Sequence, residues 1–215
     1  MIPRSIARQL LVAAAVLITL SGCAGSATTF DPTVPCGADG RAAGAYADLE
    51  AKVPTSFEGR APSSLDSGRH CSEAALGSLI VHDVSEVDYA GATWDLGSGT
   101  GVSSAIFRLP GGELPAAWIA EFYDIGARTA KRTENIATSS PTIERAGVVY
   151  RLDTLNNLSL QTVIVWGDGS YVRVVLVATS VDPSASRAAH DDLVARAVAT
   201  TTAVQTGAAT SPVKP

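Results

Sequence analysis

Apolar and polar residues alternate along two neighbouring segments near the C-terminal end of the chain. Residues 160–166 and 171–179 are rich in β-branched side chains, and residues 167–170 between them read Gly-Asp-Gly-Ser. An Asp-Gly pair between two alternating runs favours a β-hairpin, because its turn positions need positive φ. The pattern therefore predicts two antiparallel strands joined by a tight turn at Asp168 and Gly169.

Shorter apolar runs predict three more strands, over residues 93–96, 102–109 and 147–153. Glycines at 97, 99 and 101 lie between the first two of them. Such a string cradles a phosphate when a helix begins directly after it. Because a strand follows instead, we expect a hairpin loop there.

Apolar residues at helical spacing predict four helices. The first is marked by Tyr46, Leu49 and Val53, and the second begins at Ser72 and Glu73. The third begins at Pro115 and has the apolar residues Trp118, Phe122 and Ile125. The fourth begins at Asp182 and Pro183 and has the apolar residues Ala189, Leu193, Val194 and Val198. The order is helix, helix, two strands, helix, three strands, helix. It predicts an α+β domain with a mostly antiparallel sheet of about five strands, covered by helices on one face.

Composition divides the chain of 215 residues into parts. Residues 23–42 and 201–215 are rich in small residues and proline, which predicts a flexible tether and a disordered tail around one globular domain at 43–200. The apolar fraction of 46% is enough to fill a core. A formal net charge of −5 argues against a basic surface, so we expect no nucleic-acid partner.

The N-terminal segment has the pattern of a secretory signal. Arg4 and Arg8 precede an apolar run at 10–20, which is shorter than the ~20 residues that a membrane span needs. The run ends in Leu20, Ser21, Gly22 and Cys23. This end resembles the lipobox of bacterial lipoproteins, which reads Leu, two small residues and Cys.

The resemblance implies that residues 1–22 are a signal peptide and that Cys23, after cleavage, carries a diacylglyceryl thioether and further acyl chains such as palmitate. Two or more acyl chains anchor a protein firmly. We therefore expect an extracytoplasmic protein anchored to the cell membrane through Cys23. Ala24 follows Cys23. In lipoprotein sorting this residue would not retain the protein on an inner membrane, so the outer membrane is the alternative in a host with two membranes.

Two cysteines, Cys36 and Cys71, remain besides Cys23. An even number in an oxidising compartment predicts a disulfide, worth ~3–4 kcal/mol on the loop-entropy model. The alternatives are a metal pair with His70 and two free thiols. The spacing matches no compact metal motif.

No motif for catalysis, a metal or a cofactor stands out, so we assign no catalytic, metal-binding or cofactor-binding residue. The other histidines, His82 and His190, are not at a spacing that pairs metal ligands. The acidic stretch at 83–88 lacks the glycine and glutamate of a calcium loop. Trp166 and Tyr171 flank the predicted turn; a role in the core or in cross-strand packing is the first interpretation, and ligand contact is the second.

These features favour a non-enzymatic domain at the cell envelope that binds a small molecule or an envelope protein. The first alternative is an envelope hydrolase whose site forms only in three dimensions. The second is an accessory subunit of a membrane complex. A binding protein should show a concave apolar pocket, a hydrolase a perturbed acid or base beside a nucleophile, and an accessory subunit an exposed apolar patch.

Overall fold

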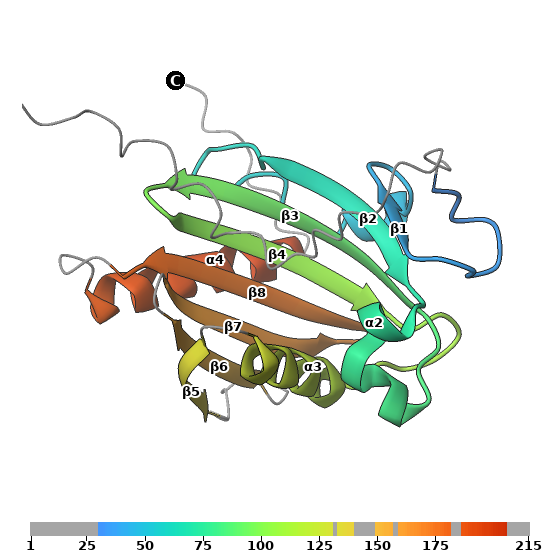
Figure 1. Ribbon diagram of the computed structural model, residues 1–215. Helices are drawn as coiled ribbons and strands as arrows, with labels where there is room; N and C mark the ends of the chain where they lie inside the picture. Colours follow the sequence, from blue (N-terminus) through green and yellow to red (C-terminus); the bar gives the residue numbers. More distant parts are fainter. Residues whose placement is uncertain (1–29, 131–132, 140–148, 157–158, 182–185, 206–215) are drawn as a thin grey trace, which may run out of the picture.

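The computed structural model describes residues 30–130, 133–139, 149–156, 159–181 and 186–205. Within these segments, eight strands form one antiparallel sheet in the order β1-β2-β3-β4-β8-β7-β6-β5 (Figure 1). The strands are β1 (Gly40–Ala42), β2 (Ser64–His70), β3 (Val87–Gly97), β4 (Thr100–Arg108), β5 (Thr133–Ser139), β6 (Val149–Asn156), β7 (Ser159–Asp168) and β8 (Tyr171–Ser180). The helices are α1 (Ala47–Glu50), α2 (Glu73–Leu76), the 3₁₀ helix η1 (Gly77–His82), α3 (Ala116–Thr129) and α4 (Arg187–Gln205). The α+β prediction is confirmed.

The sheet consists of two meanders that meet in its centre. Strands β1 to β4 form the first and β5 to β8 the second, and β4 pairs with β8 from Gly101↔Ala178 to Arg108↔Tyr171. Helix α3 lies between β4 and β5 in the chain and therefore connects the two halves. The central strands are thus held by hydrogen bonds on both sides.

The described sheet has more strands than the five predicted. The additional ones are β1, β2 and β5. In β2 the buried positions are Ser67, Gly68 and Arg69. Because none of these is apolar, the strand shows no hydrophobic alternation, and its sequence resembles a loop.

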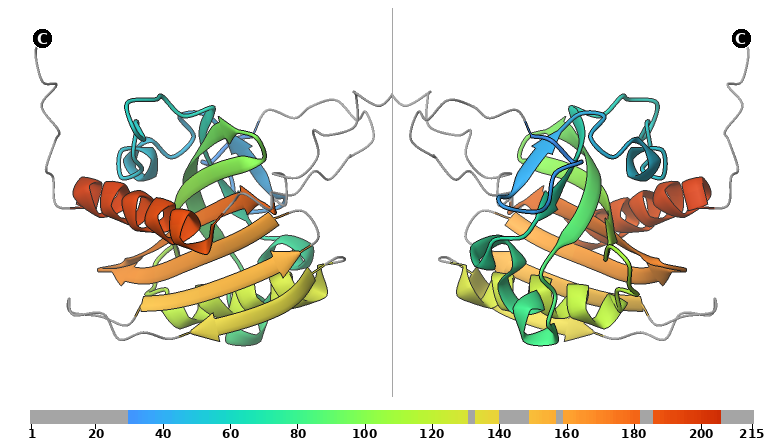
Figure 2. Two further views of the ribbon diagram at one scale, coloured as in Figure 1. Left: turned by 90° about the vertical axis from the view of Figure 1, so that its left-hand side faces the viewer. Right: turned by 90° about the vertical axis from the view of Figure 1, so that its right-hand side faces the viewer.

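The prediction that helices cover one face was wrong, because they lie on both (Figure 2). Helices α1 and α4 pack on one face, and α3 packs on the other together with α2 and η1. Strand β8 explains this arrangement: Val172 and Val174 belong to the core under α3, and Val175 and Val177 to the core under α4. A nearly continuous apolar strand needs cover on both faces.

The regular elements extend beyond the predicted domain at both ends. Gly40 pairs with Arg69 across β1 and β2, inside the region assigned to the tether, and α4 reaches Gln205, inside the assigned tail. Asp182 and Pro183, the predicted start of the last helix, lie outside the described residues. In the structure the Ser186 hydroxyl accepts the first-turn N–H of Ala189 at 3.1 Å.

The hairpin between β7 and β8 is present, but its turn lies one residue later than predicted. Asp168 pairs with Tyr171, so the two-residue loop is Gly169 and Ser170. Gly169 has φ 62°, and Ser170 is not among the residues with positive φ. A turn with glycine at its first position and positive φ there has the geometry of type II′.

Candidate functional site

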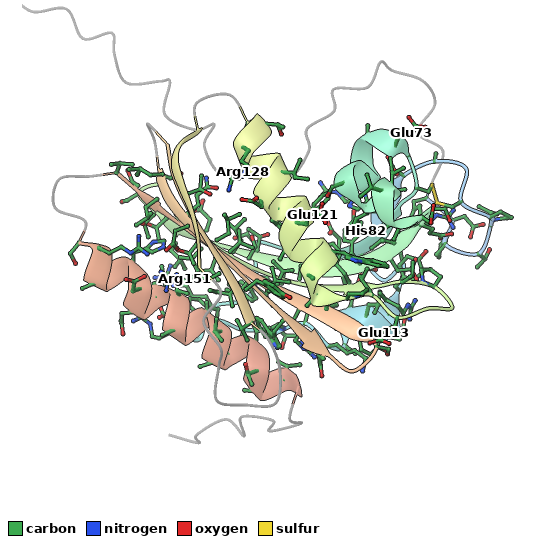
Figure 3. All side chains as sticks on the ribbon, turned by 90° about the horizontal axis from the view of Figure 1, so that it is seen from below. Glu73, His82, Glu113, Glu121, Arg128 and Arg151 are labelled. Carbon is green, nitrogen blue, oxygen red and sulfur yellow. A yellow bond between two sulfur atoms is a disulfide. The ribbon has the colours of Figure 1, made fainter. Side chains whose placement is uncertain are left out.

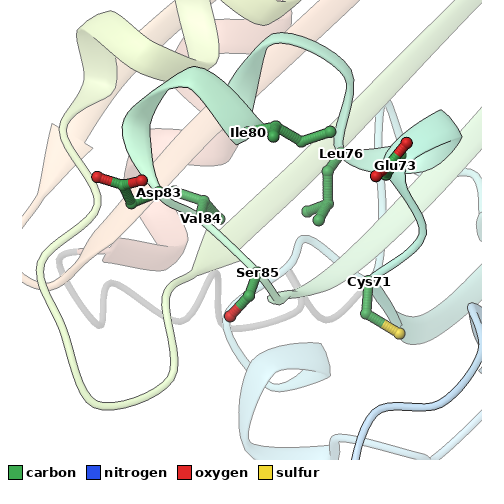
Figure 4. A pocket seen from close by; sticks show the side chains of 7 residues that line it. All are labelled: Cys71, Glu73, Leu76, Ile80, Asp83, Val84 and Ser85. Atoms are coloured by element: carbon green, nitrogen blue, oxygen red, sulfur yellow. The ribbon is translucent and has the colours of Figure 1, made fainter.

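A surface groove runs along α2 and η1 and has a volume of about 330 Å³. The groove, called the α2–η1 groove below, is lined by Cys71, Glu73, Leu76, Ile80, Asp83, Val84 and Ser85. Figure 4 shows Glu73 and Asp83 at opposite ends, with Leu76 and Ile80 between them. The groove therefore combines an apolar centre with a carboxylate at each end.

Local sequence explains the path of the chain around this groove. The Ser72 hydroxyl accepts the Ala75 N–H at 3.2 Å, so the predicted N-cap is confirmed. Gly77 has φ 52°, which turns the chain out of α2 and into η1. Asp83 ends η1 in the left-handed conformation, at φ 59°. The single helix predicted to begin at Ser72 is therefore two short helices with a bend between them.

The bend leaves apolar side chains at the surface. Leu76, Leu79 and Val84 are buried in the core under α3, whereas Ile80 is 40% exposed and Val81 is 73% exposed. Neither Ile80 nor Val81 belongs to the core under α3. They are candidates for contact with another molecule.

The charges at the groove are uncompensated. No ion pair joins Glu73 or Asp83 to any other residue that the structure describes. No Lys or Arg is among the lining residues. By contrast, every arginine of the described segments except Arg60 lies within 4.0 Å of a carboxylate.

His82 connects η1 to α3 beside the groove. Its ring stacks on Trp118, with 4.5 Å between ring centroids and 7° between planes. Its Nε2 lies 2.7 Å from Oε2 of Glu121, and Figure 3 shows the two side chains between the helices. His82 thus fixes η1 against α3 and holds the exposed Ile80 and Val81 in place.

The N-terminal segment is fastened next to the groove. Cys36 and Cys71 form a disulfide, as predicted, and Cys71 immediately precedes the Ser72 cap. Asp39 accepts the N–H groups of Cys71 and Ser72 at 2.7 and 2.9 Å. Arg69, which is only 4% exposed, donates to the carbonyl oxygens of Val34 and Asp31 at 2.7 and 3.3 Å. The disulfide therefore joins the N-terminal segment to the groove at Cys71, whereas Phe30 packs against Tyr46 at the start of α1, with 6.3 Å between ring centroids.

A second cluster surrounds His190 on α4. His190 is 2% exposed, and its Nε2 and Nδ1 lie 2.8 Å from the hydroxyls of Thr162 and Thr179. The Thr162 hydroxyl also lies 2.6 Å from Oδ1 of Asp153. Burial alone would raise the pKa of Asp153, but hydrogen bonds from Thr162, Arg187 and Arg151 outweigh it and hold the pKa below its usual value.

These contacts determine which atoms of Asp153, Thr162, His190 and Thr179 carry the protons. Because Asp153 is ionised, the Thr162 hydroxyl must donate to it and accept from Nε2–H of His190. Burial, and next the charge of Arg187, lower the pKa of His190, so the ring is neutral and its Nδ1 accepts from the Thr179 hydroxyl. The result is a chain of three hydrogen bonds from Thr179 to Asp153.

Thr179 also lines a second pocket, which has a volume of about 190 Å³. The other lining residues are Leu155, Leu160, Ser180, Val181, Ser186 and Arg187. A hydroxyl bound to a neutral imidazole, which is itself oriented through Asp153, has the connectivity of an activated nucleophile. Both nitrogens of His190 are also simply satisfied by this arrangement, as a buried imidazole requires. Sequence reasoning missed the cluster because its members are spread from residue 153 to 190.

The predicted ligand contacts, Trp166 and Tyr171, do not lie together at either pocket described above. Trp166 is 9% exposed within the core under α4. Tyr171 packs against the same core, and the ammonium of Lys52 lies 4.9 Å from its ring centroid. Their ligand contact therefore stays a prediction. Cys23, the predicted lipid attachment site, lies outside the described residues.

The acidic stretch is divided by the fold. Asp83 lines the groove, Glu86 lies 3.7 Å from Arg69, and Asp88 is buried and bound to Arg108 at 2.7 Å. Within the described segments, no three His, Cys, Asp or Glu side chains are grouped as a metal site. None of the described helices has the length and hydropathy of a membrane span. Comparisons of the chain with models of protein families, with curated proteins and with solved structures find no significant match.

Proposed function

We propose that this chain is a lipid-anchored domain outside the cytoplasm that binds another component of the cell envelope through the α2–η1 groove. The carrying observation is the groove itself: a concave surface with an apolar centre, two unpaired carboxylates and the exposed Ile80 and Val81 beside it. Binding sites combine apolar surface with a few polar groups in this way.

The place of the groove supports the same proposal. If Cys23 is the anchor, the chain from Cys23 to Phe30 is at most about 25 Å long when fully extended. Phe30 lies beside Arg69, whose guanidinium carbon is 5.4 Å from the Phe30 ring centroid. The Cys36–Cys71 disulfide then joins this segment to the start of α2. The sheet edge formed by β1 and β2 would therefore be held close to the membrane, and the groove begins at this edge, at Cys71.

Replacing Cys23 tests the anchor. We expect Cys23→Ala to move the protein from the membrane fraction to the soluble fraction, because no acyl chain can then be attached. Cys36→Ala serves as the control, since it removes a cysteine but leaves the lipobox intact. A Cys23→Ala protein that stays in the membrane fraction contradicts the lipid anchor.

Hydrogen exchange tests the groove. We expect amides of residues 73–84 to exchange more slowly in native membranes than in the purified protein, because a bound partner covers them. Amides of α4 should exchange equally in both samples. Equal exchange of residues 73–84 in the two samples contradicts partner binding at the groove.

A second candidate function is an envelope hydrolase, which the chain from Thr179 through His190 to Asp153 favours. In this reaction Oγ1 of Thr179 attacks the carbonyl carbon of an ester, and its proton moves to Nδ1 of His190. His190 returns the proton to the departing alkoxide, and water then hydrolyses the acyl-threonine. The hydrolase is the second candidate because the same hydrogen bonds are also those that a buried histidine needs for structural reasons alone.

A fluorophosphonate probe separates the two candidates. A hydrolase should become labelled at Thr179, and Thr179→Val should abolish the label. Ser180→Ala is the matched control, because Ser180 lines the same pocket. The absence of any label on Thr179 contradicts the hydrolase.

A further inference from the structure

We propose that the partner bound at the α2–η1 groove is a basic, amphipathic segment of another envelope protein. The inference rests on the proposed function, since it names the chemistry of the partner for the same groove. It is carried by three observations: the unpaired carboxylates, the exposed aliphatic residues and the acidic net charge of the chain without residues 1–22.

The first observation concerns charge. Glu73 and Asp83 stand at the two ends of the groove (Figure 4), and neither forms an ion pair with a described residue. Asp88, Asp153 and Glu58 are neutralised by arginines. Other carboxylates such as Asp95 and Glu113 also form no ion pair with a described residue, but only Glu73 and Asp83 line the groove. An uncompensated negative potential attracts and orients a cationic partner.

The second observation concerns shape and polarity. Between the carboxylates, the groove is lined by Leu76, Ile80 and Val84, and Val81 stands exposed on η1 next to Ile80. A partner that covers this surface needs apolar side chains for the centre and cationic side chains for the ends. A segment with both, such as an amphipathic helix laid into the groove, meets the two requirements together.

The third observation distinguishes a protein segment from the membrane itself. Without the two arginines in residues 1–22, 14 basic and 21 acidic side chains remain, which gives a formal net charge of −7. A membrane surface that contains anionic lipids repels such a chain, and it repels the carboxylates at the groove most directly. The exposed Ile80 and Val81 therefore fit a basic protein segment better than a lipid surface.

Peptide binding tests the inference. The mature full-length protein, kept in a nonionic detergent, is titrated into two fluorescent 12-residue peptides of Leu with either Lys or Glu in an amphipathic helical pattern. We expect the Lys peptide to bind at least tenfold more tightly than the Glu peptide. Asp83→Asn should weaken the binding of the Lys peptide by about two- to fivefold, which is typical of one exposed ion pair.

Two matched variants complete the design. Asp95→Asn removes one exposed carboxylate at the far end of β3 and should leave the Lys peptide's affinity unchanged. Val81→Ser removes apolar contact and should weaken the binding of both peptides. The thermal unfolding midpoint of each variant confirms that it is folded.

Each result has a distinct meaning. Equal affinity for the two peptides, together with loss of both in Val81→Ser, overturns the basic partner but keeps the groove as a binding site. If neither Asp83→Asn nor Val81→Ser changes the affinity for either peptide, the proposed function is overturned as well. Tighter binding to phosphatidylglycerol vesicles than to phosphatidylcholine vesicles, reduced by Val81→Ser, identifies the membrane as the occupant and also overturns the basic partner.

Discussion

His190 is buried with both ring nitrogens hydrogen-bonded to threonine hydroxyls. A second proton would force Nδ1–H to donate to Thr179 and would place a positive charge in the core. The charges that act on the pKa of this ring belong to Arg187, Asp191, Asp153 and Arg151. The neutral ring is therefore the form that the fold accommodates.

The free energy of unfolding should consequently depend on pH. The pKa of His190 lies below its ordinary value of 6.5, chiefly because of burial. As the pH falls through about 6.5, the unfolded chain takes up a proton that the folded chain does not, and this lowers the free energy of unfolding until the folded pKa is passed. For a single proton the loss cannot exceed about 1.4 kcal/mol per pH unit. Urea unfolding at pH 7.5 and pH 5.5 measures it.

His190→Gln separates this residue from its neighbours. The variant should be less stable at pH 7.5 but should lose less stability between pH 7.5 and pH 5.5. Part of the loss remains, because burial also lowers the pKa of His70. A variant with the same pH dependence as the native protein would show that His190 does not titrate on unfolding.

Gly169 determines the turn between β7 and β8. A Cβ at this position would meet no atom within 4 Å, so any cost of substitution comes from the backbone at φ 62°. Gly169→Ala should lower the free energy of unfolding by about 1–2 kcal/mol. Ser170→Ala, at the other turn position, should change it by less than about 0.5 kcal/mol. Urea unfolding of the two variants compares them, and equal values would contradict the assigned turn.

The disulfide joins the N-terminal segment to the start of α2. It closes a loop with a sequence separation of 35 residues, for which the loop-entropy model gives about 4 kcal/mol. Cys36→Ala with Cys71→Ala should lower the thermal midpoint under oxidising conditions. In a reductant, the native protein and the variant should melt together. Identical midpoints without reductant would mean that the bond contributes nothing to stability.

The elements differ in how far sequence could predict them. Strands β4, β7 and β8 were predicted because they carry long apolar patterns, and the apolar run of β8 also contained the unused signal for helices on both faces. Strand β2 was not predictable in this way, because it buries Ser67 and Arg69. The groove was missed for a related reason: Gly77 divides a pattern that fits one helix into two.

At the scale of the whole molecule, the N-terminal segment and the α2–η1 groove are joined at one edge of the sheet. The Cys36–Cys71 bond, the Asp39 contacts to Cys71 and Ser72, and Arg69 all hold this region together. A lipid on Cys23 would place that region nearest the membrane. Phe30, the first described residue, packs against Tyr46, which itself packs on the core under α1 and α4.

Site-specific crosslinking in intact cells tests partner binding at the groove most directly. A photo-crosslinking residue replaces the exposed Val81 on η1 or, as the control, the exposed Ala199 on α4. We expect a crosslinked species from position 81 that is identified as one envelope protein, is weakened by Asp83→Asn and is absent from position 199. No crosslink at position 81, or the same crosslinks from both positions, would contradict the account.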